Sequence, residues 1–431
     1  MSRSDASPPR SRVVILGGGF GGLYAAKALA RAPVDIILID RRNHHLFQPL
    51  LYQVATAGLS AVDVGEPIRK VLRRQGNATV LMAHAERVDV LGRRVLLAGG
   101  SEMAYDYLIV ATGATHSYFG NDEWQEHAPG LKTIEDALTI RRKLLSAFER
   151  AEATADEDER RAWITFVVVG GGPTGAETAG AMAEVARHTL AQDFRRFDPG
   201  DARILLIEGA DRILPAYPPE LSAKAQRQLE RLGVEVRTGT MVTAVDATGV
   251  VAGGERIDCG LVVWGAGVAA SPLGATLGAP LDRAGRVLVE PDLSVAGHPE
   301  VFVIGDLAAV RKGEDQVPGI APAAIQGGHH AAASIRRALR GLPAEPFSYR
   351  DRGSMATLGR KAGVAVIGRL RLSGLMAWLC WLFVHIFFLI GFRNRFVVMF
   401  EWAWSYFTYQ RSARLILNEA VEEPARPPPR P

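Results

Sequence analysis

The sequence predicts an α/β fold with two Rossmann-like dinucleotide-binding domains and a C-terminal helical segment. The main observation is a pair of glycine-rich loops, GGGFGG at 17–22 and GGGPTG at 170–175. Each loop follows a run of strand formers, RVVIL or ITFVVV, and opens into an Ala-rich stretch. This is the strand–turn–helix context that the glycine pattern requires, and its occurrence twice predicts two bound dinucleotides.

Both loops satisfy the pattern G-x-G-x-x-G. The glycines concerned are Gly17, Gly19 and Gly22 in the first loop and Gly170, Gly172 and Gly175 in the second. The first glycine permits a tight turn, the second lets the backbone approach a pyrophosphate, and the third lets helix and strand pack closely. The pyrophosphate then lies at the helix N-terminus, where backbone N–H groups favour an anion.

An acidic residue closes the strand that follows each loop. Asp40 ends VDIILID, where an acid would bind the ribose 2′-hydroxyl of an adenosine. Glu208 ends RILLIE and would bind NADH in the same way, while its charge would repel the 2′-phosphate of NADPH. It lies further from its loop than the roughly 20 residues of the fingerprint, because a long helix and the loop FRRFDPGD intervene. The alternative for either acid is a solvated strand end.

Composition limits the class of protein. With 431 residues the chain can form two or three domains with full hydrophobic cores. A formal net charge of only +4 argues against a nucleic-acid-binding protein of the clustered-basic kind. Cys259 and Cys380 form no C-x-x-C pair, which excludes a thiol relay, and no cluster of ligands predicts a metal. We expect the catalytic domains to face a reducing cytoplasm.

The order of motifs predicts how the chain is divided. Short strand runs such as VFVIGD at 301–306 end in Gly or Asp, at the sheet edge where doubly wound folds bind ligands. We expect one nucleotide-binding domain at 12–116 and 285–345, with a second one inserted at 160–284. The other expected segments are a flexible N-terminus (1–11), a helical connector (117–159), a membrane-anchoring region (346–420) and a disordered Pro-rich tail (421–431).

The region after residue 346 has the composition of a membrane-binding segment. The stretch at 372–392 carries no formal charge and would span about 30 Å as a helix. Aromatic residues recur at helical spacing over 396–407, and two arginines lie on each side of the apolar run. Because this positive charge is symmetric, we expect the segment to lie in the interface of one leaflet. The alternatives are a single transmembrane span and a buried core or dimer interface.

Four further segments carry a distinctive pattern. They are NHHLFQPLLYQVATAGLS (43–60), ATGATHSYFG (111–120), VFVIGDLA (301–308) and APAAIQGG (321–328). In order and content they resemble the type II NADH dehydrogenases, the single-chain NADH:quinone oxidoreductases of respiratory chains. The resemblance implies a glutathione-reductase-like flavoprotein with FAD in the first domain and NADH in the second. It also implies electron transport to ubiquinone or menaquinone without proton pumping, at the cytoplasmic face of a bacterial inner (plasma) membrane.

The resemblance assigns roles around the flavin. It places the FAD pyrophosphate at the first glycine loop, the adenosine ribose at Asp40 and the adenine against the backbone of Val88. Asp306 can accept hydrogen bonds from the flavin ribityl hydroxyls, and its alternative role is a helix N-cap. Gly113 lets the chain pass beside the flavin, and Gly267 is the analogous turn near the nicotinamide. The alternative for both is an ordinary turn glycine.

Two residues are the candidates for catalysis. By resemblance Glu177 approaches the nicotinamide–flavin contact and manages quinone protons, and its alternative role is to interact with the helix dipole. Gln326 would bind a quinone carbonyl, with a helix-surface position as the alternative. The family commonly shows A-Q-x-A-x-Q here, whereas this chain has Pro322 in place of the first Gln, which puts a mechanism with two amides in doubt. Ile325 and Pro322 are the quinone candidates that neighbour Gln326. Gln48 and Pro49 are two more, with core packing as the alternative.

Rival functions share part of this pattern. Sulfide:quinone oxidoreductases share the fold and the membrane tail but need paired redox cysteines, which the sequence lacks. The missing thiols also disfavour other pyridine-nucleotide reductases. A flavin sensor like apoptosis-inducing factor is the non-enzymatic alternative. The sequence leaves open which quinone is used, whether the tail supports a homodimer, and the role of His385 within the apolar run.

Overall fold

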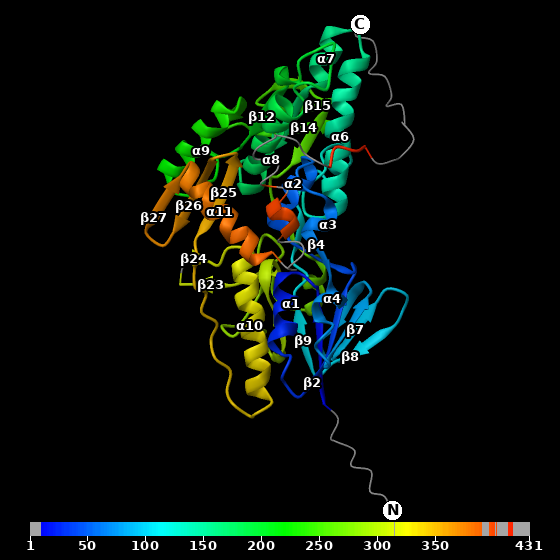
Figure 1. Ribbon diagram of the computed structural model, residues 1–431. Coiled ribbons are helices and arrows are strands. Elements are labelled where there is room, and N and C mark those ends of the chain that lie inside the picture. Colours follow the sequence, from blue (N-terminus) through cyan, green and yellow to red (C-terminus); the bar gives the residue numbers. More distant parts are fainter. Residues whose placement is uncertain (1–9, 314, 390–395, 401, 403–412, 417–431) are drawn as a thin grey trace, which may run out of the picture. The chain divides into compact units, whose positions relative to one another are not determined.

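The structure is a computed structural model that describes residues 10–313, 315–389, 396–400, 402 and 413–416 (Figure 1). The Pro-rich tail expected at 421–431 and the two arginines after the apolar run lie outside these residues.

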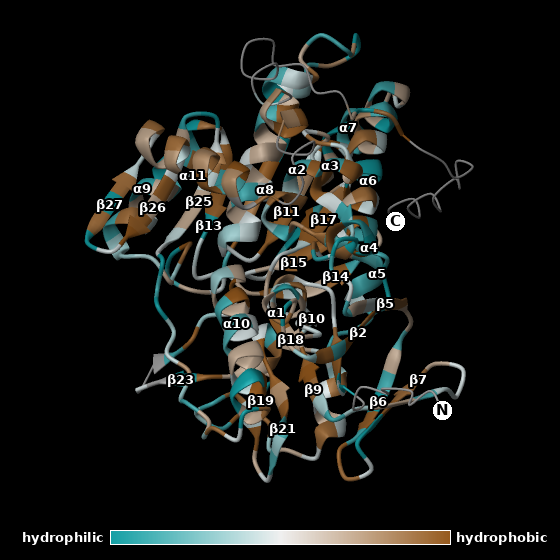
Figure 2. Cartoon of the chain, turned by 60° about the horizontal axis from the view of Figure 1, so that its bottom comes forward, coloured by the Kyte–Doolittle hydropathy of each residue, from teal (hydrophilic) through white to brown (hydrophobic). Residues whose placement is uncertain are grey.

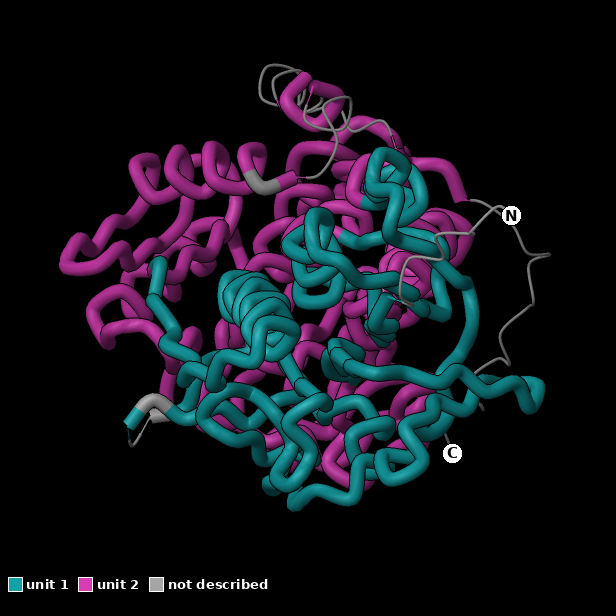
Figure 3. The backbone as a smooth tube through the Cα atoms, turned by 90° about the horizontal axis from the view of Figure 1, so that it is seen from below, with its two compact units in different colours: residues 1–46, 65–115, 268–352 teal, residues 47–64, 116–267, 353–431 magenta. Residues whose placement is uncertain are grey.

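The chain divides into two compact units (Figure 3). Unit 1 comprises residues 1–46, 65–115 and 268–352, and unit 2 comprises residues 47–64, 116–267 and 353–431. Each unit therefore consists of three segments of the chain.

Unit 1 is built on a six-stranded sheet whose strand order is β20-β21-β9-β1-β2-β5. The strands are β1 (Ser11–Leu16), β2 (Val34–Asp40), β5 (Ala78–Met82), β9 (Tyr107–Val110), β20 (Ser294–Val295) and β21 (His298–Val303). All pairs are parallel except β20 with β21. The apolar residues of β1 are fully buried, as expected for a parallel strand covered on both faces.

Two helices of unit 1 pack side by side on this sheet (Figure 1). They are α1 (Phe20–Ala28), which follows the first glycine loop, and α10 (Ala321–Ala338). The smaller elements of the unit are β3 (His44–Leu46), β4 (Gly65–Pro67), α4 (Ile68–Leu72), β6 (Ala85–Asp89), β7 (Arg94–Leu97), β8 (Glu102–Ala104), β18 (Val268–Ala270), η4 (Pro272–Leu277), β19 (Val287–Leu288), η5 (Gly305–Leu307), β22 (Ala308–Ala309), β23 (Arg311–Lys312) and β24 (Asp315–Gln316).

Unit 2 contains a second parallel sheet, with the order β13-β12-β11-β17. Its strands are β11 (Thr165–Val169), β12 (Arg203–Ile207), β13 (Val234–Arg237) and β17 (Leu261–Trp264). Helix α8 (Pro173–Glu184) follows the second glycine loop and continues as a π-helical turn, η2 (Val185–Thr189). Strands β11 and β17 are buried along their whole length and consist of hydrophobic residues apart from Thr165 (Figure 2).

Further elements surround this second sheet. They are η1 (Gln48–Leu50), α2 (Leu51–Ala55), α3 (Ala61–Val64), α5 (Trp124–His127), α6 (Ile134–Ala153), α7 (Glu157–Trp163), η3 (Pro199–Asp201), α9 (Pro219–Arg231) and an antiparallel sheet of β14 (Val242–Asp246), β15 (Gly249–Ala252) and β16 (Glu255–Asp258). Strand β10 (Ala114–His116) crosses the boundary between the two units along the chain.

The C-terminal region contains a further sheet that the sequence analysis did not foresee. Strands β25 (Ser354–Gly359), β26 (Ala362–Ile367) and β27 (Leu370–Ser373) form an antiparallel meander in unit 2. Helix α11 begins only after Gly374, covers Leu375–Phe388 and ends where Leu389 becomes extended. The apolar run at 372–392 is therefore not one continuous helix. Among the described helices, none has the length and apolarity needed to cross a bilayer.

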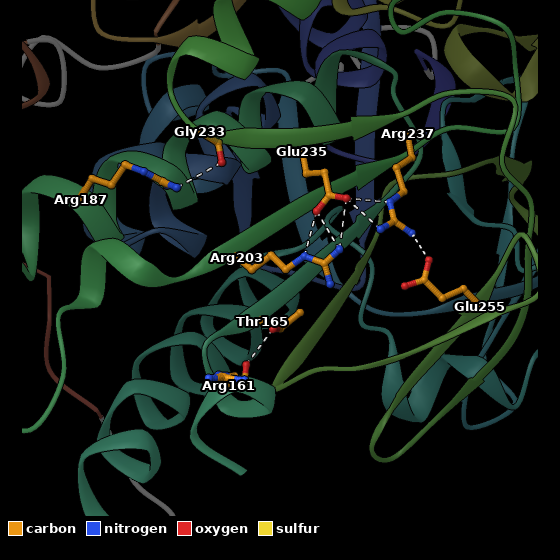
Figure 4. Close-up of polar contacts among 8 residues, drawn as sticks. All are labelled: Arg161, Thr165, Arg187, Arg203, Gly233, Glu235, Arg237 and Glu255. Atoms are coloured by element: carbon orange, nitrogen blue, oxygen red, sulfur yellow. Dashed lines mark hydrogen bonds and ion pairs between the residues drawn. The ribbon is translucent and has the colours of Figure 1, made fainter. Parts of the chain in front are cut away.

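A surface network of ion pairs joins β12, β13 and β16 at the edge of unit 2 (Figure 4). Glu235 pairs with Arg203 and with Arg237, each at 2.8 Å, and Arg237 pairs with Glu255 at 2.7 Å. Exposed pairs contribute only about 0–1 kcal/mol each. The network therefore fastens the edge of the sheet without dominating its stability.

Helix α8 lies directly against β25, and Gly180 makes this approach possible. A Cβ atom at Gly180 would overlap the carbonyl oxygen of Leu358. We therefore predict that Gly180→Ala lowers the free energy of unfolding by about 1–3 kcal/mol, although alanine is the better helix former. Thermal melting measures the effect. The control is Gly76→Ala, where a Cβ would have no neighbour within 4 Å, and an equal loss in both variants would contradict the prediction.

Candidate active site

The first glycine loop joins β1 to α1 with the geometry of a dinucleotide site. Gly17 has a φ of +100°, which favours glycine. A Cβ at Gly22 would overlap the carbonyl oxygen of Gly17, so the start of the helix lies tightly against the end of the strand. A Cβ at Gly19 would meet no atom within 4 Å, which leaves that side of the loop open to a ligand.

Asp40 holds this loop from the end of β2. Its Oδ2 accepts a hydrogen bond from the backbone N–H of Gly18 at 2.6 Å, and its Oδ1 accepts one from the N–H of Arg42 at 2.7 Å. The carboxylate is thus oriented by the backbone and is more than a solvated strand end.

His45 holds the next peptide group of this loop, and the sequence analysis missed it. Its Nδ1 lies 3.0 Å from the carbonyl oxygen of Gly18. A carbonyl oxygen can only accept, so Nδ1 carries the proton and donates it. Burial lowers the pKa of His45 to about 4, and the ring is therefore neutral at physiological pH. Two side chains, Asp40 and His45, thus fix the N–H and the C=O of one loop residue.

The remaining FAD candidates also lie in unit 1. Gly113 has a φ of +70°, and its carbonyl oxygen accepts a hydrogen bond from the N–H of Ser271 at 3.0 Å. The N–H of Val88 donates to Oγ1 of Thr276 at 3.1 Å, so this donor is already engaged. Asp306 lies within η5, whose N-cap is Ile304, and it lines a pocket together with Gly319.

Unit 1 fits FAD on the evidence of its own atoms. No described side chain caps the N-terminus of α1, so the N–H groups of its first turn are suited to a pyrophosphate. The hydroxyl of Thr112, beside Gly113, is buried and has no hydrogen-bond partner among the described residues. A buried hydroxyl of this kind is costly unless a ligand supplies the partner. Thr112 is a second residue that the glycine pattern alone did not reveal.

The second glycine loop repeats this geometry in unit 2. Gly170 has a φ of +101°, and a Cβ at Gly175 would overlap its carbonyl oxygen. Glu208 Oε2 accepts a hydrogen bond from the N–H of Gly171 at 2.6 Å, and its Oε1 accepts one from Ala210 at 2.7 Å. This is the arrangement that Asp40 makes in unit 1.

The N-terminus of α8 is also suited to a pyrophosphate. Gly172 is its N-cap, with open space at the Cβ position, and Pro173 occupies the first turn, where proline has no N–H to lose. Gly267 has a φ of +81° and follows β17. It comes directly after Gly265 and Ala266, whose backbone packs on Gly170.

Glu177 lies on α8 between β25 and α11. One carboxylate oxygen accepts a hydrogen bond from the N–H of Thr357 at 3.3 Å. Burial raises the pKa of Glu177 to about 8, although this hydrogen bond and the indole of Trp381 both act to lower it. The carboxyl group is therefore poised to exchange a proton near neutral pH.

An aromatic cluster packs α11 on the segment that contains Gln48 and Pro49. Phe47 meets His385 edge to face at 6.1 Å, and Tyr52 meets Trp381 in the same way at 6.4 Å. His385 donates from Nδ1 to the carbonyl oxygen of Trp381 at 2.7 Å and stacks on its ring. Burial lowers the pKa of His385 to about 4, so it is a neutral residue that bonds a helix carbonyl.

The quinone candidates do not all remain in one unit. Gln48 is exposed in η1 and Pro49 is half-buried beside it, both in unit 2. Gln326, Ile325 and Pro322 lie half-buried on α10 in unit 1, with Pro322 in the first turn. Both polar atoms of the Gln326 amide bond the backbone of Arg350. Nε2 donates to the carbonyl oxygen of Arg350 at 2.9 Å, and Oε1 accepts from its N–H at 3.0 Å. Only one N–H of this amide remains for another acceptor.

Comparison with known proteins identifies the class. The family model described as pyridine nucleotide-disulphide oxidoreductase matches residues 11–328, and the chain belongs to this family. The type II NADH:quinone oxidoreductase NdhA of Mycobacterium tuberculosis is 49% identical over 429 residues, covering 96% of this chain and 90% of that protein. Ndh of the same organism is 48% identical over 430 residues, covering 96% and 92%. Within the family, the chain is one of the type II NADH:quinone oxidoreductases.

Solved structures agree on the fold. NDH2 from Plasmodium falciparum in complex with NADH has a TM-score of 0.85 at 21% identity, covering 95% of this chain and 100% of that one. The sulfide:quinone oxidoreductase of Aquifex aeolicus has a TM-score of 0.72 at 18% identity, covering 95% and 96%. The predicted α/β flavoprotein fold, the FAD and NADH cofactors and the NADH-to-quinone activity without proton pumping are confirmed.

We predict that His45 supports FAD binding through its hydrogen bond to Gly18. His45→Phe removes the donor and leaves a buried carbonyl unsatisfied, at a cost of about 1–3 kcal/mol. His45→Asn keeps a donor at the position of Nδ1. We therefore expect FAD to dissociate at least about tenfold more readily from the Phe variant and near the normal rate from the Asn variant, as measured by the fluorescence of released flavin.

The control for His45 is His84→Asn, at an exposed histidine in the same unit. FAD retention in His45→Phe equal to that in the unmodified protein would contradict the prediction.

Proposed function

We propose that the two glycine loops divide the reaction, with NADH bound by unit 2 and FAD by unit 1. The observation that supports this division is the matched pair of sites, each with an uncapped helix N-terminus and an acid hydrogen-bonded to the loop. When bound, the flavin accepts the hydride of NADH and supplies two electrons to a quinone. The protein binds the two nucleotides, orients them and excludes water from the site.

In unit 1, Gly17, Gly19 and Gly22 would hold the FAD pyrophosphate. Asp40 would bind the adenosine ribose, and Val88 would contact the adenine through its backbone. Thr112, Gly113 and Asp306 would hold the flavin end. The orphaned hydroxyl of Thr112 supports this placement.

In unit 2, Gly170, Gly172 and Gly175 would hold the NADH pyrophosphate, and Gly267 would border the nicotinamide end. Glu208 would bind the adenosine ribose and disfavour a 2′-phosphate. Its fixed orientation against Gly171 supports a preference for NADH over NADPH.

For the quinone, we keep Gln326 with its neighbours Ile325 and Pro322, and Gln48 with Pro49. One free N–H on Gln326 is enough for one carbonyl hydrogen bond. The choice between ubiquinone and menaquinone does not follow from these residues.

Isolation of the protein from membranes with mild detergent tests the proposal. We expect the visible spectrum of bound flavin, with NADH oxidised faster than NADPH when a soluble quinone is present. Colourless protein, or oxidation of sulfide without oxidation of NADH, would overturn it.

Glu177 is proposed as the group that manages quinone protons. Burial in unit 2 favours the protonated form of this carboxyl group, and the opposing effects of the Thr357 N–H and the Trp381 indole do not offset it. Reduction of a quinone consumes two protons, and a carboxyl group that is protonated near neutral pH can supply one from its oxygen.

We predict that Glu177→Gln separates the two halves of the reaction. Reduction of the flavin by NADH should change less than about threefold, whereas reoxidation by quinone should slow by about 10²-fold, the usual contribution of a general acid. Stopped-flow absorbance of the flavin follows each half. Equal losses in the two halves would contradict the assignment.

The same substitution has an expected effect on stability. The pKa of Glu177 is raised from 4.5 to about 8 in the folded protein, so its ionisation disfavours folding. The stability present at low pH is therefore lost as pH rises through this range. Relative to Glu177→Gln, the unmodified protein should melt at a progressively lower temperature between about pH 5 and pH 8.

We further propose that α11 attaches the enzyme to the lipid bilayer surface, on the cytoplasmic face of a bacterial inner membrane. Met376, Leu379, Phe383 and Phe387 recur every three or four residues and leave 59%, 44%, 71% and 61% of their surface exposed. Ala377 and Trp381, on the other face, are buried. An exposed apolar face of this kind is typical of a helix that lies in the membrane interface.

We predict that replacing Phe383 and Phe387 together by serine releases the protein from membranes. Each phenylalanine contributes about 1.5–3 kcal/mol when buried, so the loss of two should reduce binding by more than about 100-fold. Sedimentation with vesicles measures this, while oxidation of NADH with a soluble quinone should persist. Leu91→Ser is the control, because Leu91 is 88% exposed in unit 1. Unchanged sedimentation with an altered oligomeric state would favour a homodimer contact instead.

A further inference from the structure

Phe119 combines two unfavourable features at one position of unit 2. Its φ is +55°, in the left-handed region that a bulky side chain rarely adopts. Its ring is 68% exposed, although it is fully apolar. Strained residues of this kind tend to lie at binding and catalytic sites.

The surrounding chain holds the ring in this position. A Cβ at Gly267 would lie only 2.5 Å from Cζ of Phe119, so the ring covers the backbone of Gly267. The ring meets Trp264 edge to face, with the centroids 6.4 Å apart. Trp264 in turn donates its indole N–H to the carbonyl oxygen of Ser117 at 2.8 Å. One side of the ring is thus supported, and the rest faces solvent.

The turn that carries Gly267 packs on the second glycine loop. A Cβ at Gly170 would lie 2.6 Å from the backbone nitrogen of Ala266, the residue before Gly267. The N–H of Gly265 donates to the carbonyl oxygen of Val169 at 2.7 Å, which joins this turn to the strand that enters the loop. Within unit 2 the turn at 265–267 therefore contacts the glycine loop through Gly265 and Ala266 and the ring of Phe119 through Gly267.

We infer that Phe119 is a binding residue for NADH, and that the exposed side of its ring forms a wall for the nicotinamide–ribose half of the dinucleotide. The inference rests on the proposed NADH site at Gly170–Gly175. A planar apolar ring is suited to a flat heteroaromatic group, and covering it removes exposed apolar surface. The strained backbone keeps the ring over Gly267, beside the pyrophosphate position, so the wall exists before the ligand arrives.

The test compares three substitutions in the holoenzyme. Phe119→Ala should raise the Kd of NAD⁺, measured by calorimetry without turnover, by about tenfold. Phe119→Tyr retains the ring and should restore binding to within about twofold. Phe119→Gly removes the ring and also the backbone strain. It should therefore bind NAD⁺ as weakly as the Ala variant does, yet melt at a higher temperature than the Ala variant.

These outcomes separate binding from a structural role. If Phe119→Ala and Phe119→Gly both bind NAD⁺ with unchanged Kd, the inference is wrong. If the two variants differ in Kd in step with their melting temperatures, the ring acts only through stability, and the inference is also wrong. Leu91→Ala is the matched control for loss of an exposed apolar side chain.

A further variant tests the proposed site on its own. Glu208→Gln should weaken the discrimination between NADH and NADPH, because it removes the charge opposed to a 2′-phosphate. Unchanged discrimination would put the NADH site itself in doubt, whatever the result at Phe119. Altered discrimination together with an unaffected Phe119→Ala would overturn only the inference about the ring.

Discussion

The contact between the first and third glycines of each loop is the constraint on which both nucleotide sites depend. At Gly22 and Gly175 any side chain would overlap a carbonyl oxygen of its own loop. This closeness brings the first turn of α1 or α8 against the end of the preceding strand. The N–H groups of that turn are thereby aimed at the open side of the loop, where an anion is stabilised.

The acids and His45 act on this same constraint. Asp40 and Glu208 each accept two backbone hydrogen bonds, so the negative charge at the strand end is oriented before any ribose arrives. In unit 1 His45 adds a third hydrogen bond, which it donates to the carbonyl oxygen of Gly18. A loop held in this way loses little conformational entropy on binding, which is the physical advantage of preorganisation.

Local patterns carried most of what could be predicted. The glycine loops, their acids and the parallel strands depend on residues close together in sequence, and the resemblance supplied the electron donor and acceptor. The sheet β25–β27 and the pairing of Gln326 with Arg350 were not foreseen, because both depend on partners brought together by the tertiary fold. His45 was missed because two adjacent histidines do not reveal which one points inward. The left-handed backbone of Phe119 leaves no trace in composition or spacing.

Helix α8 carries both the N-terminus proposed to hold the NADH pyrophosphate and, just beyond its first turn, the carboxyl group of Glu177. A doubly charged phosphate pair arriving at that end would make ionisation of Glu177 still less favourable. Dinucleotide and proton would then behave as linked ligands, because each would raise the affinity of the protein for the other by the same factor. Because the pKa of Glu177 is about 8, the uptake of hydrogen ions from the medium would be largest at mildly alkaline pH, where part of the carboxyl groups is ionised before the donor docks.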